Sequence, residues 1–195
     1  MKYALLVLAL AAALPQMAQA EELSYSYVEA GYTANDYDNS ILDTFDGFYI
    51  NGSYNFSDTG FYINGSHKQT SGDISGNSGY DIDNSSLGFG YHHEVADTVD
   101  LVGQLDYIHT DVNFGDSING YRVSAGVRGS FSEKFEGSVM GHYENISDID
   151  ASDSSISFEG QYKFNETLGL VAGVEFGQHY ENDVVGYNIG LRASF

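Results

Sequence analysis

The chain has 195 residues and a formal net charge of −21, from 28 acidic and 7 basic side chains. Such an acidic chain repels nucleic acid, which excludes that class of partner. The chain contains no cysteine, so packing and backbone hydrogen bonds, rather than disulfides, must hold it together.

Residues 1–20 have the features of an export signal. Lys2 supplies a positive charge, residues 4–14 form an uncharged apolar run, and Ala18-Gln19-Ala20 is a small-residue cleavage site. This pattern is typical of a secretory signal peptide and is too short for a membrane helix. We therefore expect a mature domain over residues 21–195, without proline because Pro15 leaves with the signal.

Apolar and polar residues alternate in segments along the mature chain, which is the period of a β-strand with two unlike faces. The alternation is clearest in the last segment, which ends on Phe195. We predict strands over residues 23–34, 45–56, 60–69, 84–93, 99–111, 119–131, 135–145, 155–164, 168–180 and 185–195. Most of these segments are long enough to cross a bilayer, for which a tilted strand needs roughly 9–11 residues.

The predicted connections alternate in length. Turns over residues 57–59, 94–98, 132–134 and 165–167 are short, and those over residues 35–44, 70–83, 112–118, 146–154 and 181–184 are mostly longer polar loops. Short turns on one side and long loops on the other are typical of an outer-membrane barrel. We predict a closed, antiparallel, up-and-down transmembrane β-barrel of about ten strands. The count falls to eight if two segments are extended loop hairpins.

The phase of the alternation tells which face meets lipid. If the apolar phase faces outward, no charge faces lipid, where a charge at the midplane costs roughly 2–4 kcal/mol. The opposite phase, facing the lumen, holds the charged strand residues: Glu29, Asp106, Arg122, Arg128, Glu136, Glu144, Glu159, Lys163, Glu175 and Arg192. A soluble, lipocalin-like barrel with the phases inverted is also compatible with the alternation alone.

Aromatic residues favour the membrane barrel because they gather at two heights. One set lies near the short turns: Phe56, Phe61, Tyr91, Phe131, Phe135, Phe164 and Phe195. The other lies toward the long loops: Tyr32, Phe48, Tyr107, Tyr121, Tyr143 and Tyr187. Two rings at two depths match the aromatic girdles at membrane interfaces, whereas a soluble core has no reason to sort rings by height.

Several segments resemble a known family. Residues 24–32, residues 99–105, residues 120–123 with 126–129, and the Phe195 ending are similar to small outer-membrane proteins labelled sulfation-dependent quorum factors. The resemblance covers most of the mature chain and implies a bacterial outer-membrane β-barrel. The family label also implies a secreted signal, but Tyr25, Tyr27 and Tyr32 are better explained as strand residues.

The lumen is the first candidate for a functional site. Four cationic side chains there, including Arg122 and Arg192, face about six acidic ones across a narrow interior. Barrels of about eight strands are filled by side chains, while those of 16 strands leave a channel. Because charges removed from water need partners, we expect a salt-bridged plug. The alternative is a narrow, mildly cation-selective pore, since acids exceed bases.

Acidic residues at the loop end are the second candidate: Asp36, Asp38, Asp73, Asp81, Asp83, Asp111, Asp116, Asp148, Asp150, Asp153 and Asp183. Solvated acidic loops are the simple interpretation. Carboxylates are also hard ligands for Ca²⁺ or Mg²⁺, which would bridge the loops to lipopolysaccharide phosphates. Asp148, Asp150 and Asp153 are weak metal candidates, because their spacing lacks a calcium-loop signature.

Catalysis is the third candidate. His67, His109 and His179 lie toward the outer strand ends, with Asp106, Asp111 and Asp183 nearby in sequence, and His92 and His93 lie at the other end. The chain has no nucleophile elbow, zinc-protease motif or phosphate loop. We predict a non-enzymatic envelope barrel without a cofactor, and keep a small-solute pore and a surface adhesin or ligand-recognition barrel as alternatives. Its expected partners are outer-membrane lipid, lipopolysaccharide and the barrel-insertion machinery, which would recognise the strand ending in Phe195.

Overall fold

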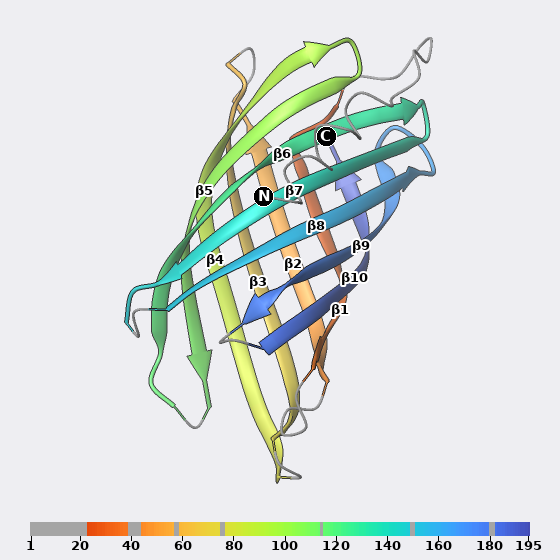
Figure 1. Cartoon of the computed structure of the whole chain (residues 1–195). Coiled ribbons are helices and arrows are strands. Elements are labelled where there is room, and N and C mark those ends of the chain that lie inside the picture. The colour runs from red at the N-terminus through yellow and green to blue at the C-terminus, as the bar shows by residue number, and fades with distance from the viewer. Residues whose placement is uncertain are drawn as a thin grey trace.

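The computed structural model describes residues 23–38, 44–56, 59–74, 77–113, 115–148, 151–179 and 182–195. Within them the chain forms ten antiparallel strands that close into one barrel (Figure 1). The strands are β1 (Tyr27–Tyr37), β2 (Phe45–Asn55), β3 (Phe61–Ile74), β4 (Asn77–Ala96), β5 (Val99–Val112), β6 (Ile118–Ser132), β7 (Phe135–Ile146), β8 (Ala151–Lys163), β9 (Leu168–His179) and β10 (Asn182–Ser194). The prediction of a ten-stranded up-and-down barrel is confirmed. The predicted signal peptide lies outside the described residues.

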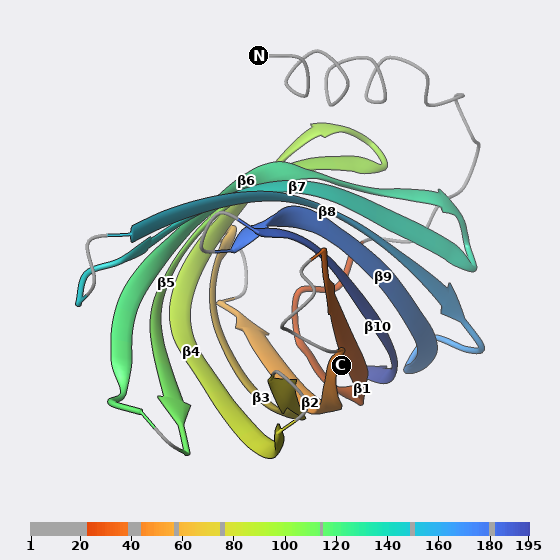
Figure 2. The same ribbon diagram turned by 60° about the horizontal axis from the view of Figure 1, so that its bottom comes forward.

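The barrel closes where the first strand meets the last. β1 pairs with β10 along its whole length, from Tyr27 opposite Ser194 to Tyr37 opposite Val184. Closure removes the unpaired sheet edge that lipid would not tolerate. The strands are tilted and curve around a single lumen (Figure 2). In the described part of the chain, no helix is long and apolar enough to cross a membrane.

The two ends of the barrel differ less in loop length than predicted. At the terminal end, where β1 begins and β10 finishes, the strands are joined through residues 56–60, 97–98, 133–134 and 164–167. At the opposite, distal end, residues 38–44, 75–76, 113–117, 147–150 and 180–181 separate the strands. Much of the sequence predicted as long loops therefore continues the strands.

The β3–β4 hairpin shows this correction most clearly. The predicted loop over residues 70–83 is mainly ladder, with Thr70 opposite Ile82, Gly72 opposite Tyr80, and Ile74 opposite Asn77. This hairpin reaches furthest at the bottom of Figure 1. Polar composition was misleading because a strand that extends past the bilayer needs only a paired backbone, not an apolar face.

The first described residues correct a second boundary. Residues 23–26 were predicted as strand, but β1 begins at Tyr27. Ser26 still joins the barrel wall, since its carbonyl accepts from the Phe195 amide at 3.0 Å and its hydroxyl from the Asn55 amide at 3.0 Å. Leu23 and Tyr25 instead pack inside the lumen with Tyr62 and Val102. The apolar core of this protein is therefore a small cluster inside the barrel.

The outer face carries the predicted apolar phase. Phe48 and Phe195 are each 71% exposed, and most of the other aromatic residues predicted for the two rings are also exposed: Tyr32, Phe56, Phe61, Tyr91, Tyr107, Tyr121, Phe135, Tyr143, Phe164 and Tyr187. Tyr54 and Tyr162 belong to the same surface and were not assigned to the rings. Lipid is the solvent that suits an apolar surface of this extent.

Several residues of the predicted outer face are less exposed than expected, among them Phe131, Val99 and Val139. Phe131 is half-buried, and its ring lies over Gly137 on the adjacent strand. A register shift between Ser130 and Ser132 marks this point in the β6–β7 ladder. Val99 and Val139 are 8% exposed. Alternation identifies the phase of a residue, but packing by neighbours decides its exposure.

Candidate functional site: the charged lumen

The predicted lumen charges all lie on the inner phase of their strands, and the structure divides them into separate groups. Glu29, Glu159 and Arg192 form one group, and Arg128, Glu136 and Lys163 form another. Arg122 pairs with Glu144. Asp106 and Glu175 make contacts of a different kind, with amides and a hydroxyl.

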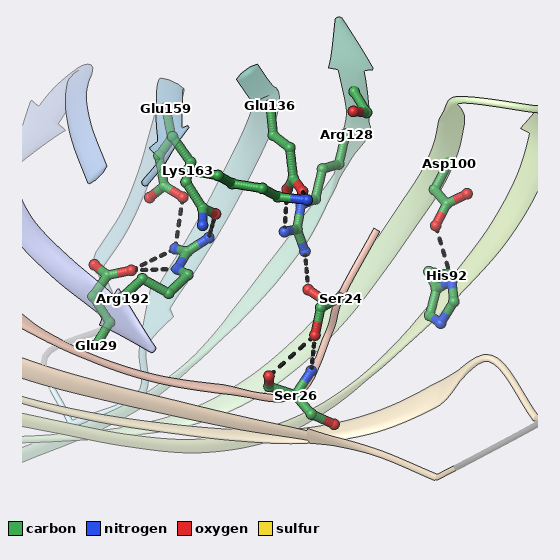
Figure 3. A network of polar contacts seen from close by, with 12 residues as sticks. Ser24, Ser26, Glu29, His92, Asp100, Arg128, Glu136, Glu159, Lys163 and Arg192 are labelled. Carbon is green, nitrogen blue, oxygen red and sulfur yellow. Dashed lines mark hydrogen bonds and ion pairs between the residues drawn. The ribbon is translucent and has the colours of Figure 1, made fainter. Parts of the chain in front are cut away.

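Arg192 on β10 is the centre of the first group (Figure 3). Its Nε donates to Glu29 Oε2 at 2.7 Å, its Nη2 to Glu159 Oε1 at 2.8 Å, and its Nη1 to Gln161 Oε1 at 3.2 Å. The Tyr49 hydroxyl donates to the second Glu29 oxygen at 2.7 Å. Glu29 is fully buried, so the guanidinium supplies most of the compensation that its charge requires.

Glu136 on β7 is the centre of the second group. Arg128 Nη2 lies 2.6 Å from its Oε2, and Lys163 Nζ lies 2.6 Å from its Oε1. Arg128 also donates from Nη1 to the Ser24 carbonyl at 2.8 Å (Figure 3). The second group therefore ties three wall strands to the N-terminal segment inside the barrel.

The segment of residues 23–26 lies across the lumen between these groups and an aromatic stack. The centroids of the Tyr25 and His92 rings are 3.9 Å apart, and the two rings are nearly parallel. The guanidinium carbon of Arg128 lies over the Tyr25 ring, 4.8 Å from its centroid. His92 Nδ1 is 3.0 Å from Asp100 Oδ2. We name residues 23–26, the two ionic groups and this stack the floor of the lumen.

Sequence reasoning missed the floor. Tyr25 continues the alternation of the strand that follows it, so nothing in the local pattern separates it from a wall residue. The positions of His92 and Asp100 on the inner phase were readable, because Tyr91 and Leu101 beside them face outward. Their contact with Tyr25 depends on how the chain enters the barrel, which only the three-dimensional structure specifies.

A third set of polar residues lies above the floor, on β6 to β8. Arg122 donates to Glu144 Oε2 from Nε at 3.1 Å and from Nη2 at 2.7 Å. His142 bridges two hydroxyls, with Nδ1 2.8 Å from Ser124 Oγ and Nε2 2.8 Å from Ser157 Oγ. These contacts line the wall rather than cross the lumen.

Asp106 and Glu175 rely on neutral donors. Asn64 donates to Asp106 Oδ1 at 2.6 Å, and Gln104 donates to both of its oxygens at 3.0 and 2.8 Å. Ser155 donates to Glu175 Oε1 at 2.5 Å. Hydrogen bonds from neutral donors to a carboxylate are about twice as strong as those between neutral groups.

Lys68 on β3 is a lumen cation that sequence reasoning left out. It is half-buried and lines the cavity described below. The alternation would have placed it, because Phe61 and Ile63 on the same strand face outward and position 68 has the opposite phase. The predicted strand over residues 60–69 already included it, but its side chain was not counted among the lumen charges.

A cavity of about 510 Å³ occupies the lumen above the floor. Its lining starts at Tyr25, Arg128 and Arg192 and continues upward to the distal strand ends at Tyr37 and Ile146. Asp100, Glu136 and Lys163, which lie nearer the terminal end, do not line it. The cavity thus extends to the distal end and stops at the floor.

The acidic residues predicted for the loops lie largely on the distal strand extensions. Those within strands are Asp36, Asp73, Asp81, Asp83, Asp111, Asp153 and Asp183, while Asp38, Asp116 and Asp148 follow or precede strands. Asp148 accepts from the backbone and side-chain nitrogens of Asn119 at 2.7 and 3.0 Å. Asp150 lies outside the described residues. Among the residues that are described, no three His, Cys, Asp or Glu side chains group as metal ligands do.

The predicted histidine–carboxylate pairs are only partly brought together. His109 Nε2 lies 3.1 Å from Asp111 Oδ2, and its Nδ1 lies 2.8 Å from Asn119 Oδ1. His67 contacts the Ser85 hydroxyl at 3.0 Å, and Asp106 points to Asn64 and Gln104 instead of a histidine. The side chain of His179 lies outside the described set.

Comparison with known proteins gives one family and several structures. The family model described as outer membrane protein beta-barrel domain matches residues 4–159. No curated protein matches the chain.

Three solved structures illustrate the likeness of fold. The beta domain of the Bordetella autotransporter Brka has 12% identity and a TM-score of 0.56, covering 87% of this chain and 99% of its own. Ail, the attachment invasion locus protein of Yersinia pestis, has 17% identity and a TM-score of 0.45, with coverages of 89% and 100%. The KdgM porin has 12% identity and a TM-score of 0.46, with coverages of 86% and 99%. At 12% identity, the likeness to the Brka beta domain concerns the fold alone.

Proposed function

Because the chain belongs to the outer membrane protein beta-barrel domain family of bacteria, we propose that it is a non-enzymatic envelope barrel whose lumen is closed at the terminal end and open to the distal end. The floor is the observation that carries this proposal. It combines a buried aromatic stack at Tyr25 with ionic groups centred on Glu136 and Arg192, below a polar cavity.

The floor has the properties of a fixed plug. Glu29 and Glu136 are 0% and 2% exposed, and each is held by at least one cation. Opening a passage there would separate these pairs or leave a buried charge without a partner, at a cost of about 3–5 kcal/mol for each pair broken. Thermal motion therefore supports no lasting open state, and we expect the native barrel not to conduct.

Single-channel recording tests the proposal directly. Residues 21–195, refolded and checked for heat-modifiable migration on a gel, should give no discrete current steps in a planar bilayer. The double variant Leu23→Ala with Tyr25→Ala removes the side chains that enter the lumen and keeps the backbone of the segment, so it should conduct. Tyr54→Ala, which removes an outward-facing tyrosine, is the matched control and should stay silent. Reproducible steps from the folded, unmodified chain would refute the closed floor.

A narrow cation-selective pore is the second candidate, favoured by the cavity itself. Its lining contains more acidic residues, among them Asp106, Glu144 and Glu175, than basic ones. If the unmodified protein conducts, this reading expects cation selectivity that increases when Arg122 or Arg128 is neutralised. Conductance without a response to either substitution would count against a path past these residues.

The distal acidic residues support a surface role in recognition or adhesion. Asp36, Asp81, Asp111 and Asp183 are exposed on the distal parts of their strands. Bridging of such carboxylates to lipopolysaccharide phosphates by Ca²⁺ or Mg²⁺ is consistent with the chemistry of hard oxygen ligands. Removing the tip of the β3–β4 hairpin should abolish surface binding and leave a folded barrel. Chelation that changes neither barrel stability nor surface association would refute the cation bridge.

The remaining expectations concern export and enzymatic activity. Export by a signal over residues 1–20 and recognition of Phe195 by the insertion machinery follow from the outer-membrane location. From the resemblance to sulfation-dependent quorum factors, we take only the barrel fold and not the secreted signal. Tyr27 and Tyr32 lie on β1, and Tyr25 lies in the floor. We expect alanine at His109 or His179 to leave every surface activity unchanged.

A further inference from the structure

Lys68 is a charge that the described part of the chain leaves without a direct partner. Its Nζ makes no hydrogen bond or ion pair there, although the side chain is half-buried and lines the cavity. Its neighbours on β4 and β5, Asn84 and Thr110, bond to each other at 2.7 Å. An ammonium in a narrow lumen loses part of its hydration, so an anionic group from outside the chain would stabilise it.

The opposite wall offers the complementary charge. Glu175 on β9 also lines the cavity and, among the described residues, has no cation within ion-pair distance. Lys68 and Glu175 interact electrostatically across the cavity while remaining too far apart for an ion pair. Arg122, which forms an ion pair with Glu144, lies beside the gap and also interacts electrostatically with Glu175. Lys68 and Glu175 are thus a positive and a negative group that line the same cavity and that the described residues leave without an ion pair.

We propose that this space binds a small zwitterion, such as an amino acid or a short peptide, with its carboxylate at Lys68 and its ammonium at Glu175. A simple anion at Lys68 would be repelled by Glu175 and Glu144, and a simple cation at Glu175 by Lys68 and Arg122. The acidic distal end also disfavours ligands with a net negative charge.

The size and polarity of the cavity suit such a ligand. Its volume of about 510 Å³ lies within the roughly 300–1,000 Å³ typical of small-molecule sites. Ser66 and Ser86, whose hydroxyls are 2.7 Å apart, and Gln178 add neutral hydrogen-bonding groups to the lining. The zwitterion site rests on the proposed closed floor only in that the ligand enters the cavity from the distal end. Binding is therefore measurable whether or not the barrel conducts.

Calorimetric titration of the detergent-folded chain with L-alanyl-L-alanine tests the proposal. The dipeptide should bind. Each of two blocked forms should bind at least about tenfold more weakly, because each loses one charge contact. One form is N-acetylated and lacks the ammonium; the other is the C-terminal amide and lacks the carboxylate.

Variants assign each charge to its partner. Lys68→Met should weaken binding of the dipeptide and leave binding of the amide unchanged, since the amide has no carboxylate to lose. Glu175→Gln should weaken the dipeptide and leave the acetylated form unchanged. Lys134→Met and Glu166→Gln, which change exposed charges in the terminal-end turns, are the matched controls and should leave all affinities unchanged.

Three results would overturn the proposal. They are absence of dipeptide binding to the folded barrel, binding of a blocked form as tight as that of the dipeptide, and losses in the control variants as large as those in Lys68→Met or Glu175→Gln. Absence of binding together with a lower unfolding midpoint for Lys68→Met would make Lys68 and Glu175 a purely structural pair. Binding by a barrel that also conducts would retain the zwitterion site and refute the closed floor, so the two proposals fail separately.

Discussion

Replacing Arg192 with methionine should destabilise the barrel by about 3–5 kcal/mol, because it leaves a buried charge without its partner. Arg192 contacts Glu29 at 2.7 and 2.5 Å, Glu159 at 2.8 Å and Gln161 at 3.2 Å, and lies 4.2 Å from the Tyr27 ring centroid. Of its two acidic partners, Glu159 is 32% exposed and regains water, whereas Glu29 is 0% exposed and does not. Glu29 therefore accounts for most of the expected loss.

The double variant Glu29→Gln with Arg192→Met separates the loss of a pair from the burial of a lone charge. Removing both charges should recover most of the stability, since an apolar or neutral replacement of a buried pair is often nearly neutral. Arg122→Met is the control at a more hydrated pair, with Arg122 36% and Glu144 16% exposed. Solvent screening should limit its cost to about 1 kcal/mol.

Urea unfolding and refolding in phospholipid vesicles measures these free energies. The chain contains no tryptophan, so far-ultraviolet circular dichroism and heat-modifiable gel migration are suitable probes. A loss below about 1 kcal/mol for Arg192→Met, or a double variant as unstable as the single one, would refute the view that Glu29 is a desolvated charge dependent on Arg192.

Three further predictions concern the wall. Leu105→Arg, on the lipid face at mid-strand, should cost about 2–4 kcal/mol in the same urea assay, and Phe135→Arg, beside a turn, about 0–1 kcal/mol; equal costs would contradict the assigned depths. Gly31→Ala should lower folding yield, because its Cβ would lie 2.2 Å from the Ile189 carbonyl oxygen, whereas Gly103→Ala, with no atom within 4 Å, should fold normally. Phe195→Ala should reduce the folded fraction in cells while leaving spontaneous refolding into vesicles unchanged, and an equal loss in both would argue against recognition by the insertion machinery.

The wall of the barrel could be predicted from the sequence because it follows a local rule. Side chains two residues apart share a face, so an uncharged apolar phase and a charged opposite phase identify both the strands and the side that meets lipid. Arg192 and Glu29 were placed in the lumen for this reason. The same rule places Lys68 in the lumen, because residue 68 lies in the predicted strand over residues 60–69 and has the phase opposite to Phe61 and Ile63.

Contacts across the lumen depended on the tertiary structure. Alternation says that Arg192 and Glu29 face inward, but their meeting requires β1 to pair with β10 in one register. The length of the β3–β4 hairpin was underestimated because polar residues beyond the bilayer resemble a loop in composition while their backbone continues the ladder.

The sequence by itself determined a closed barrel, its two faces and its bacterial outer-membrane class, because lipid penalises every charge and every unpaired backbone group on the outer wall. Only the tertiary structure decided what occupies the interior: that Leu23 and Tyr25 pack inside the lumen, that Tyr25 stacks on His92, and that Lys68 and Glu175 line one cavity without forming an ion pair. Inside a barrel, neighbours come from strands far apart in the chain, so their contacts follow from closure and register and have no local signature.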